Sequence, residues 1–213
     1  MAVGTTGESA TIDFEEHISL IEYFVKYVNG RIKVIAGTGA NSTIEALELT
    51  KSAKDAGADA ALLVSPYYNK PTQEGMYQHF KKLNDVSSIP IVIYNIPGRC
   101  VIDMSVETMA RLSKLDKIIG VKDATADLSK TSLQRYLIGK DFIQLSGEDM
   151  TALALMAHGG CGCISVTSNV APELCAHLQV ACQSYDYKKA LEIQDKLIPL
   201  HKALFIDCLL YTS

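Results

Sequence analysis

The sequence lacks several features that would point to particular classes of protein. Its 213 residues carry 20 Lys and Arg against 24 Asp and Glu, so there is no basic excess and nucleic acid is not an expected partner. No run of about 18 apolar residues is present, so no membrane-spanning helix is expected. Met1-Ala2-Val3 leads straight into a glycine turn, which argues against a signal peptide. These absences favour a cytoplasmic globular protein with one main domain.

Metal ligands at characteristic spacings are also missing. Cys161 and Cys163 lie close in the sequence, but no second pair stands at zinc-site spacing, so both are interpreted as small buried thiols. Six cysteines in a chain of this length do not make a disulfide framework. The five histidines fall on expected helices without ligand spacing and are interpreted as surface or core residues. We therefore expect no metal.

What the sequence does contain is an alternation of short apolar strands and amphipathic helices. The strands expected are 34–38, 60–65, 91–95, 118–122, 142–146 and 162–166. The helices expected are 13–28, 42–56, 72–86, 105–113, 128–136, 150–158, 172–184, 186–197 and 199–205. The strands are rich in Val and Ile without alternating polarity, which is typical of a parallel sheet covered on both faces. The repeat fits a doubly wound sheet or a (β/α)8 barrel.

Lys122 closes one of these apolar strands, 118–122. Burial disfavours the ammonium form and lowers the pKa of a lysine, which makes its amine a nucleophile that can form a Schiff base with a carbonyl substrate. The ordinary alternative is a lysine that leaves the strand for solvent. Lys122 by itself does not decide between the two.

Two other segments favour the catalytic interpretation. The turn Gly4–Ser9 can direct backbone N–H groups and the hydroxyls of Thr5 and Thr6 at a small carboxylate. In the second segment an apolar strand ends in Tyr94, and a Pro-Gly turn then presents Arg99. Taken singly, these are also compatible with an ordinary turn, a core tyrosine and a surface arginine.

Together the segments resemble the pyruvate-dependent Schiff-base lyases, and among them the dihydrodipicolinate synthase family. The resemblance runs from Gly4 to about Asp207 and includes the motifs Ser65–Pro71, Leu145–Asp149 and Ile164–Asn169. It implies a (β/α)8 barrel with the active site at the carboxyl ends of the strands, and a homotetramer. It also implies that no metal or organic cofactor is needed, because the lysine supplies the electron sink.

Members of the family have a strand and a helix before the position that matches the start of this sequence, and this chain lacks them. We expect 1–185 to form a partial (β/α)8 barrel, 186–207 to begin a C-terminal helical domain, and 208–213 to be a tail foreign to the family pattern. A barrel without its first strand exposes sheet edges. The chain alone is therefore expected to be poorly soluble or partly molten and less active than a longer form, with an inactive truncated barrel as an alternative.

The activity implied by the resemblance is the condensation of pyruvate with L-aspartate 4-semialdehyde to give 4-hydroxy-tetrahydrodipicolinate, in lysine and diaminopimelate biosynthesis. In that reaction Lys122 forms the imine and Tyr94 relays protons. Thr6, and Tyr68 from a neighbouring subunit, would complete the relay.

The resemblance also implies how the substrates are held. Thr5 and Thr6 would bind the pyruvate carboxylate, and Arg99 the carboxylate of the semialdehyde. Gly147 and Ile164 would line the pocket through their backbones. N-acetylneuraminate lyase and the 2-keto-3-deoxy sugar acid aldolases share the lysine and the tyrosine, and they are the alternatives that Arg99 argues against.

A set of positions matches those that bind the end product, lysine, at a subunit interface in regulated members of the family. These are Ser9, Ala10, Ile12, His17, Asn41, Glu45 and Tyr67. Glu45 can take an ammonium group, and His17 and Asn41 can supply hydrogen bonds. An ordinary polar interface is the alternative to feedback regulation.

Overall fold

The computed structural model describes residues 1–206, so the tail predicted at 208–213 lies outside the described residues. Strands and helices alternate along the chain, as the sequence predicts. The chain divides into two compact units, Met1–Val121 and Lys122–Ser213. The boundary predicted at residue 185 stays a prediction.

The first unit contains a parallel sheet whose strands follow chain order. They are β1 (Ile35–Gly37), β2 (Ala60–Val64) and β3 (Ile91–Asn95), with β4 (Ile118–Asp123) next to β3 and extending into the second unit. Nearly every residue of β2, β3 and β4 is buried, which explains the absence of alternating polarity. The segment before the glycine turn joins the sheet through a parallel bridge between Ala2 and Ala36. This bridge places Ala2 beside β1.

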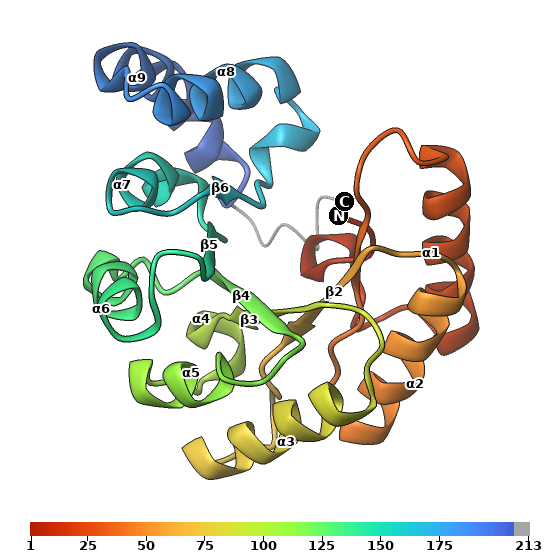
Figure 1. The fold of residues 1–213 in the computed structure, drawn as a ribbon. Coiled ribbons are helices and arrows are strands. Elements are labelled where there is room, and N and C mark those ends of the chain that lie inside the picture. Colours follow the sequence, from red (N-terminus) through yellow and green to blue (C-terminus); the bar gives the residue numbers. More distant parts are fainter. Residues whose placement is uncertain (207–213) are drawn as a thin grey trace. The chain divides into compact units, whose positions relative to one another are not determined.

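Helices α1 (Phe14–Val28), α2 (Thr43–Asp55) and α3 (Gln73–Val86) pack side by side in that order (Figure 1). The chain continues through α4 (Pro97–Cys100) and α5 (Val106–Leu112). Four of these five helices begin at a residue whose side chain accepts a backbone N–H of the first turn. These capping residues are Asp13, Ser42, Thr72 and Ser105. The sequence predicts a turn at Pro97-Gly98, and the structure has the short helix α4 there instead.

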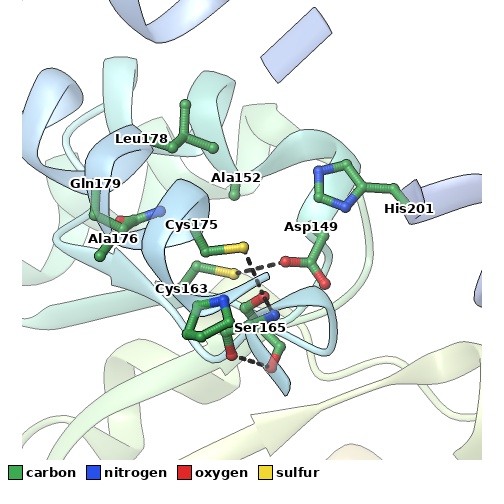
Figure 2. A pocket seen from close by; sticks show the side chains of 11 residues that line it. Asp149, Ala152, Cys163, Ser165, Cys175, Ala176, Leu178, Gln179 and His201 are labelled. Atoms are coloured by element: carbon green, nitrogen blue, oxygen red, sulfur yellow. Dashed lines mark hydrogen bonds between the residues drawn. The ribbon is translucent and has the colours of Figure 1, made fainter. Parts of the chain in front are cut away.

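The second unit contains two short strands, β5 (Ile143–Ser146) and β6 (Gly162–Cys163), which pair in parallel. The strand predicted over 162–166 is therefore too long. At Val166 and Thr167 the backbone bonds to a side chain instead of a neighbouring strand, because Asp149 Oδ2 accepts the N–H of Val166 at 2.9 Å and of Thr167 at 3.1 Å. Figure 2 shows Asp149 between Cys163 and His201.

The helices of the second unit are α6 (Leu128–Ile138), α7 (Ala152–Ala157), α8 (Pro172–Gln183) and α9 (Tyr187–Ala203). The two helices predicted at 186–197 and 199–205 are one helix that runs through Pro199. A proline inside a helix costs about 3 kcal/mol. Leu197 and His201 on either side of it are almost fully buried, and their packing offsets that cost.

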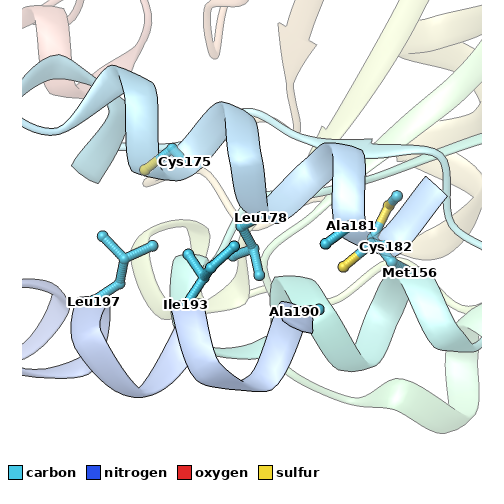
Figure 3. Packing of buried hydrophobic residues seen from close by; sticks show 8 residues of the cluster. All are labelled: Met156, Cys175, Leu178, Ala181, Cys182, Ala190, Ile193 and Leu197. Atoms are coloured by element: carbon cyan, nitrogen blue, oxygen red, sulfur yellow. The ribbon is translucent and has the colours of Figure 1, made fainter. Parts of the chain in front are cut away.

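An apolar cluster of the second unit lies where α7, α8 and α9 meet (Figure 3). Helices α8 and α9 form most of this contact. The cluster consists of Met156, Cys175, Leu178, Ala181, Cys182, Ala190, Ile193 and Leu197. In the first unit a comparable cluster joins α1 and α2 to β1 through Ile21, Ala53 and Ala36.

Cys161 and Cys163 differ from the prediction that both are buried. Cys161 is exposed and Cys163 is half-buried. Within residues 1–206, no helix is both long and apolar enough to cross a membrane.

Candidate active site

Lys122 lies at the carboxyl end of β4, and only 7% of its surface is exposed. The strand extends one residue beyond the prediction, to Asp123. The turn that follows is held by that carboxylate, because Asp123 Oδ1 accepts the N–H of Thr125 at 2.9 Å and its hydroxyl at 2.5 Å. The lysine is thus in a buried, locally rigid segment, as the apolar strand predicts.

Gly147, which follows β5, lies directly against Lys122. Its N–H donates to the carbonyl of Asp123 at 2.6 Å. A Cβ atom at Gly147 would be 2.9 Å from Lys122 Cε and 2.9 Å from Ala124 Cβ, closer than real Cβ contacts come. Only glycine therefore leaves room for the lysine side chain at this place. Ile164, the residue after β6, donates its N–H to the backbone carbonyl of Ser146 on β5 at 2.9 Å.

Cys163 is a neighbour of Lys122 that the sequence motifs do not connect with the site. Burial and the charge of Asp149 raise the pKa of its thiol, and the charge of Lys122 opposes that shift. The thiol donates to Asp149 Oδ1 at 3.9 Å. Cys163 lies on β6 and directly precedes Ile164, a residue expected to line the pocket. That position in the sequence could have identified Cys163 as a residue near the site.

Cys163 and Asp149 line a cavity of about 220 Å³ in the second unit (Figure 2). His201 is at its edge, and His201 Nδ1 lies 2.6 Å from the hydroxyl of Thr167. Cys175 also lines the cavity, and burial raises the pKa of its thiol. The two thiols are thus held in the protonated, weakly nucleophilic form.

In the first unit, Tyr94 is buried on β3 with 5% of its surface exposed. Its carbonyl accepts the N–H of Ser65 at 2.9 Å, which joins the ends of β2 and β3. Thr5 and Thr6 form a single 3-10 turn, Thr5–Gly7, which Glu8 ends with a left-handed backbone (φ 59°). Both threonines are thus in a tight turn, as the two glycines predict.

Arg99 is exposed on α4, and Pro97 occupies the first turn of that helix. Tyr68 is 89% exposed, with a left-handed backbone (φ 70°). A tyrosine this exposed, on a strained backbone, is available to another molecule. This exposure is compatible with the role that the resemblance implies at a subunit interface.

Three of the residues matched to a lysine site come together. Burial, followed by the charge of Glu45, raises the pKa of the Tyr67 phenol, which also hydrogen-bonds the backbone of Asn41. His17 is buried, and its Nε2 lies 2.7 Å from the carbonyl of Gly37. Ser9, Ala10 and Ile12 lie in the turns between Gly7 and α1.

Within residues 1–206, no group of three or more His, Cys, Asp and Glu side chains is arranged to hold a metal ion.

Comparisons with known proteins agree over almost the whole chain. The sequence model of the Dihydrodipicolinate synthetase family matches residues 1–212. The 4-hydroxy-tetrahydrodipicolinate synthase of Rhodopseudomonas palustris (strain BisA53) is 63% identical over 203 residues, which are 95% of this chain and 69% of that protein. The same enzyme of Brucella abortus biovar 1 is 58% identical over 96% of this chain and 70% of its own.

Solved structures give the same result. Dihydrodipicolinate synthase from Aquifex aeolicus superposes with a TM-score of 0.94 at 48% identity, over 96% of this chain and 70% of that one. The chloride-inhibited enzyme from Acinetobacter baumannii, complexed with pyruvate, gives 0.95 at 46% identity, over 97% and 71%. The enzyme from Cyanidioschyzon merolae with lysine bound gives 0.93 at 36% identity, over 96% and 70%. The predicted fold class, an α/β chain with the fold of a partial (β/α)8 barrel, is confirmed.

Proposed function

Because this chain belongs to the dihydrodipicolinate synthetase family, we propose that it condenses pyruvate with L-aspartate 4-semialdehyde to give 4-hydroxy-tetrahydrodipicolinate. The product is a precursor of diaminopimelate and lysine. The observation that carries the proposal is the buried Lys122 at the end of β4, packed against a residue that must be glycine.

The chemistry begins at the lysine amine. Lys122 Nζ attacks the carbonyl carbon of pyruvate, water leaves, and an imine forms. The protonated imine withdraws electrons, so the pyruvate methyl group loses a proton and becomes an enamine. The enamine carbon bonds to the aldehyde carbon of the semialdehyde, whose amino group then displaces Lys122 from the imine carbon. The ring closes and the free lysine returns, with no metal or organic cofactor required.

Protons in these steps are carried by the Tyr94 phenol. Its burial on β3 favours a defined orientation. Thr6 and a neighbouring subunit's Tyr68 complete the relay, and Thr5 and Thr6 hold the pyruvate carboxylate. The semialdehyde has a second carboxylate, and Arg99 is the cation that binds it.

The test is reduction of the imine. The protein is incubated with pyruvate and sodium borohydride, and intact mass and peptide mapping then locate the adduct. We expect one pyruvate adduct, on Lys122. No adduct, or an adduct on another lysine, would reject the assignment and favour an inactive barrel.

A substrate panel distinguishes the synthase from related aldolases. Aspartate semialdehyde should be consumed at a far higher rate than N-acetylmannosamine or a sugar-derived aldehyde. The reverse order of rates would identify a sugar acid aldolase, because these enzymes form the same imine.

Feedback by lysine is a further part of this proposal. Asn41, Glu45 and Tyr67 form a polar group with an acidic side chain, which suits an amino acid with two ammonium groups. A relative of known structure binds lysine. Titration with lysine up to millimolar concentration should inhibit the enzyme, and Glu45→Gln should weaken that inhibition. Absence of inhibition would leave this group as an ordinary polar surface.

The homotetramer and the cytoplasmic location are also proposed. Sedimentation of the protein and fractionation of the source cells would test them.

A further inference from the structure

The segment Ile96–Ser105 carries Arg99 but has little structure of its own to hold it. Helix α4 is a single turn of four residues, and no side chain caps its N-terminus. It ends at Val101, a β-branched residue with a left-handed backbone (φ 67°). A single helical turn is unstable in isolation. The position of Arg99 is therefore set by contacts from outside the helix.

One buried amide supplies two of these contacts. Asn95 is the last residue of β3 and only 1% of its surface is exposed. Its Nδ2 donates to Asp103 Oδ1 at 2.9 Å, and its Oδ1 accepts the N–H of Met104 at 3.2 Å. The amide thus ties the end of the segment back to its beginning and closes it into a loop with Arg99 in the middle.

Two further contacts anchor the same loop. Gln73 on α3 donates from Nε2 to the carbonyl of Asp103 at 2.7 Å and accepts the N–H of Ser105 at 3.0 Å. The buried thiol of Cys100 donates to the carbonyl of Ser65 at 3.2 Å. Asp103 is the common point, because its side chain meets Asn95 and its backbone meets Gln73.

The side chain of Asn95 lies on the opposite face of the sheet from the side chain of Tyr94. Successive residues of a strand point to opposite faces, so the side chains of Tyr94 and Asn95 diverge. With Tyr94 assigned to proton transfer, the amide of Asn95 acts on the loop rather than on the substrate.

We propose that Asn95 and Asp103 form a positioning pair that holds the α4 loop so that Arg99 binds the carboxylate of the aldehyde substrate. This inference rests on the role proposed for Arg99. Small displacements of a binding group cost large factors in rate or affinity, so loss of the pair should appear as weaker binding of that one substrate.

The pair can be tested by exchanging the amide at position 95 and the carboxylate at position 103, singly and together. Asn95→Asp keeps the acceptor for Met104 but sets two carboxylates against each other, and it should raise the KM for the semialdehyde roughly tenfold. Asp103→Asn keeps a donor and an acceptor in place, and it should raise this KM by about threefold at most. The double variant, Asn95→Asp with Asp103→Asn, restores the hydrogen bond between the two side chains with donor and acceptor exchanged, while the carboxylate at position 95 still accepts the N–H of Met104. Its KM should return to within about threefold of the parent value.

Two readouts and one control variant separate positioning from general damage. Borohydride trapping of pyruvate on Lys122 should be unchanged, since the pair serves only the second substrate. Amide hydrogen exchange should accelerate over 96–105 in Asn95→Asp and recover in the double variant. The matched control is Gln144→Glu, which alters a buried amide of the second unit that donates to Thr131 at 3.1 Å. It should lower the melting temperature without raising the KM for the semialdehyde.

The outcomes are decisive in both directions. An unchanged KM in Asn95→Asp, or no recovery in the double variant, overturns the positioning pair. If Asn95→Asp fails to fold, Gln73→Ala loosens the same loop from its outer side and should raise the same KM, and an unchanged value there overturns the pair as well. Arg99→Ala could leave the semialdehyde KM unchanged while the Asn95 and Asp103 variants still alter hydrogen exchange over 96–105. In that case the role proposed for Arg99 is wrong, but Asn95 and Asp103 still hold the loop.

Discussion

The two units hold their central cationic residues by different means. In the second unit Lys122 is fixed by close packing, because the strand buries it and Gly147 leaves no spare volume beside its Cε atom. In the first unit Arg99 is exposed on a single helical turn, and side-chain amides and a carboxylate hold the loop around it. A residue held by packing is sensitive to added volume, whereas one held by hydrogen bonds is sensitive to lost polar groups.

The largest effect is expected from Lys122→Arg. The guanidinium keeps a positive charge but cannot lose its proton at neutral pH, so no imine can form. Borohydride trapping of pyruvate and synthase activity should both fall to background. Trapping that survives at the original rate would show that another amine is the nucleophile.

The next largest effect is expected from Gly147→Ala, which tests the packing side of the comparison. The added methyl group would meet Lys122 Cε and Ala124 Cβ at 2.9 Å, so the lysine must move. We expect kcat to fall by about a hundredfold, with a smaller change in the KM for the semialdehyde.

Gly98→Ala is the matched control, because nothing lies within 4 Å of a Cβ atom at Gly98. It should leave kcat close to the parent value. Equal losses in the two variants would refute the packing argument.

Arg99→Ala tests the other side of the comparison and should have an intermediate effect. Loss of one charge-assisted contact is expected to raise the KM for the semialdehyde by roughly one to two decades. Pyruvate trapping should persist at the parent rate. Collapse of pyruvate trapping with a normal semialdehyde KM would mean that the arginine serves the first substrate.

The smallest effect concerns stability and pH in the first unit. His79 on α3 is buried, which lowers its pKa from 6.5 to about 4, and its Nδ1 lies 2.8 Å from the hydroxyl of Thr43. The neutral form is favoured in the folded state, so between pH 6.5 and about 4 the unfolded chain binds the extra proton. Stability is complete above pH 6.5 and is lost as the pH falls towards 4.

When the pH falls from 7 to 5, protonation linked to His79 should lower the free energy of unfolding by about 2 kcal/mol. Urea titration at the two pH values measures this change. His79→Gln has no titratable ring and should lose correspondingly less over the same interval. An identical loss in both proteins would assign the pH dependence to other groups.

Much of this arrangement could be predicted from the sequence because it depends on local patterns. Apolar runs located the strands to within one or two residues, with β6 as the exception. The bonds that end β6 come from Asp149, a residue more than ten positions away, and no local pattern reveals them. Helix α9 continues through Pro199 because Leu197 and His201 are buried by distant residues.

The same reasoning applies to the candidate site. Lys122, Tyr94 and the threonine turn stand in motifs that can be recognised from the sequence. The closeness of Gly147 to the lysine Cε, and the bonds of Asn95 to Asp103 and Met104, depend on three-dimensional distances. An asparagine at the end of an apolar strand was a signal of the second feature, but its partners could not be named from the sequence.

The crowding at Gly147 has a consequence for how the gene can change over time. Every amino-acid replacement there adds at least one carbon atom where none fits, so natural selection should remove such alleles whatever the chemistry of the new side chain. Gly98 has open space around it, and its codon should drift freely among related organisms. Two glycines that look alike in the printed sequence should therefore have very different histories.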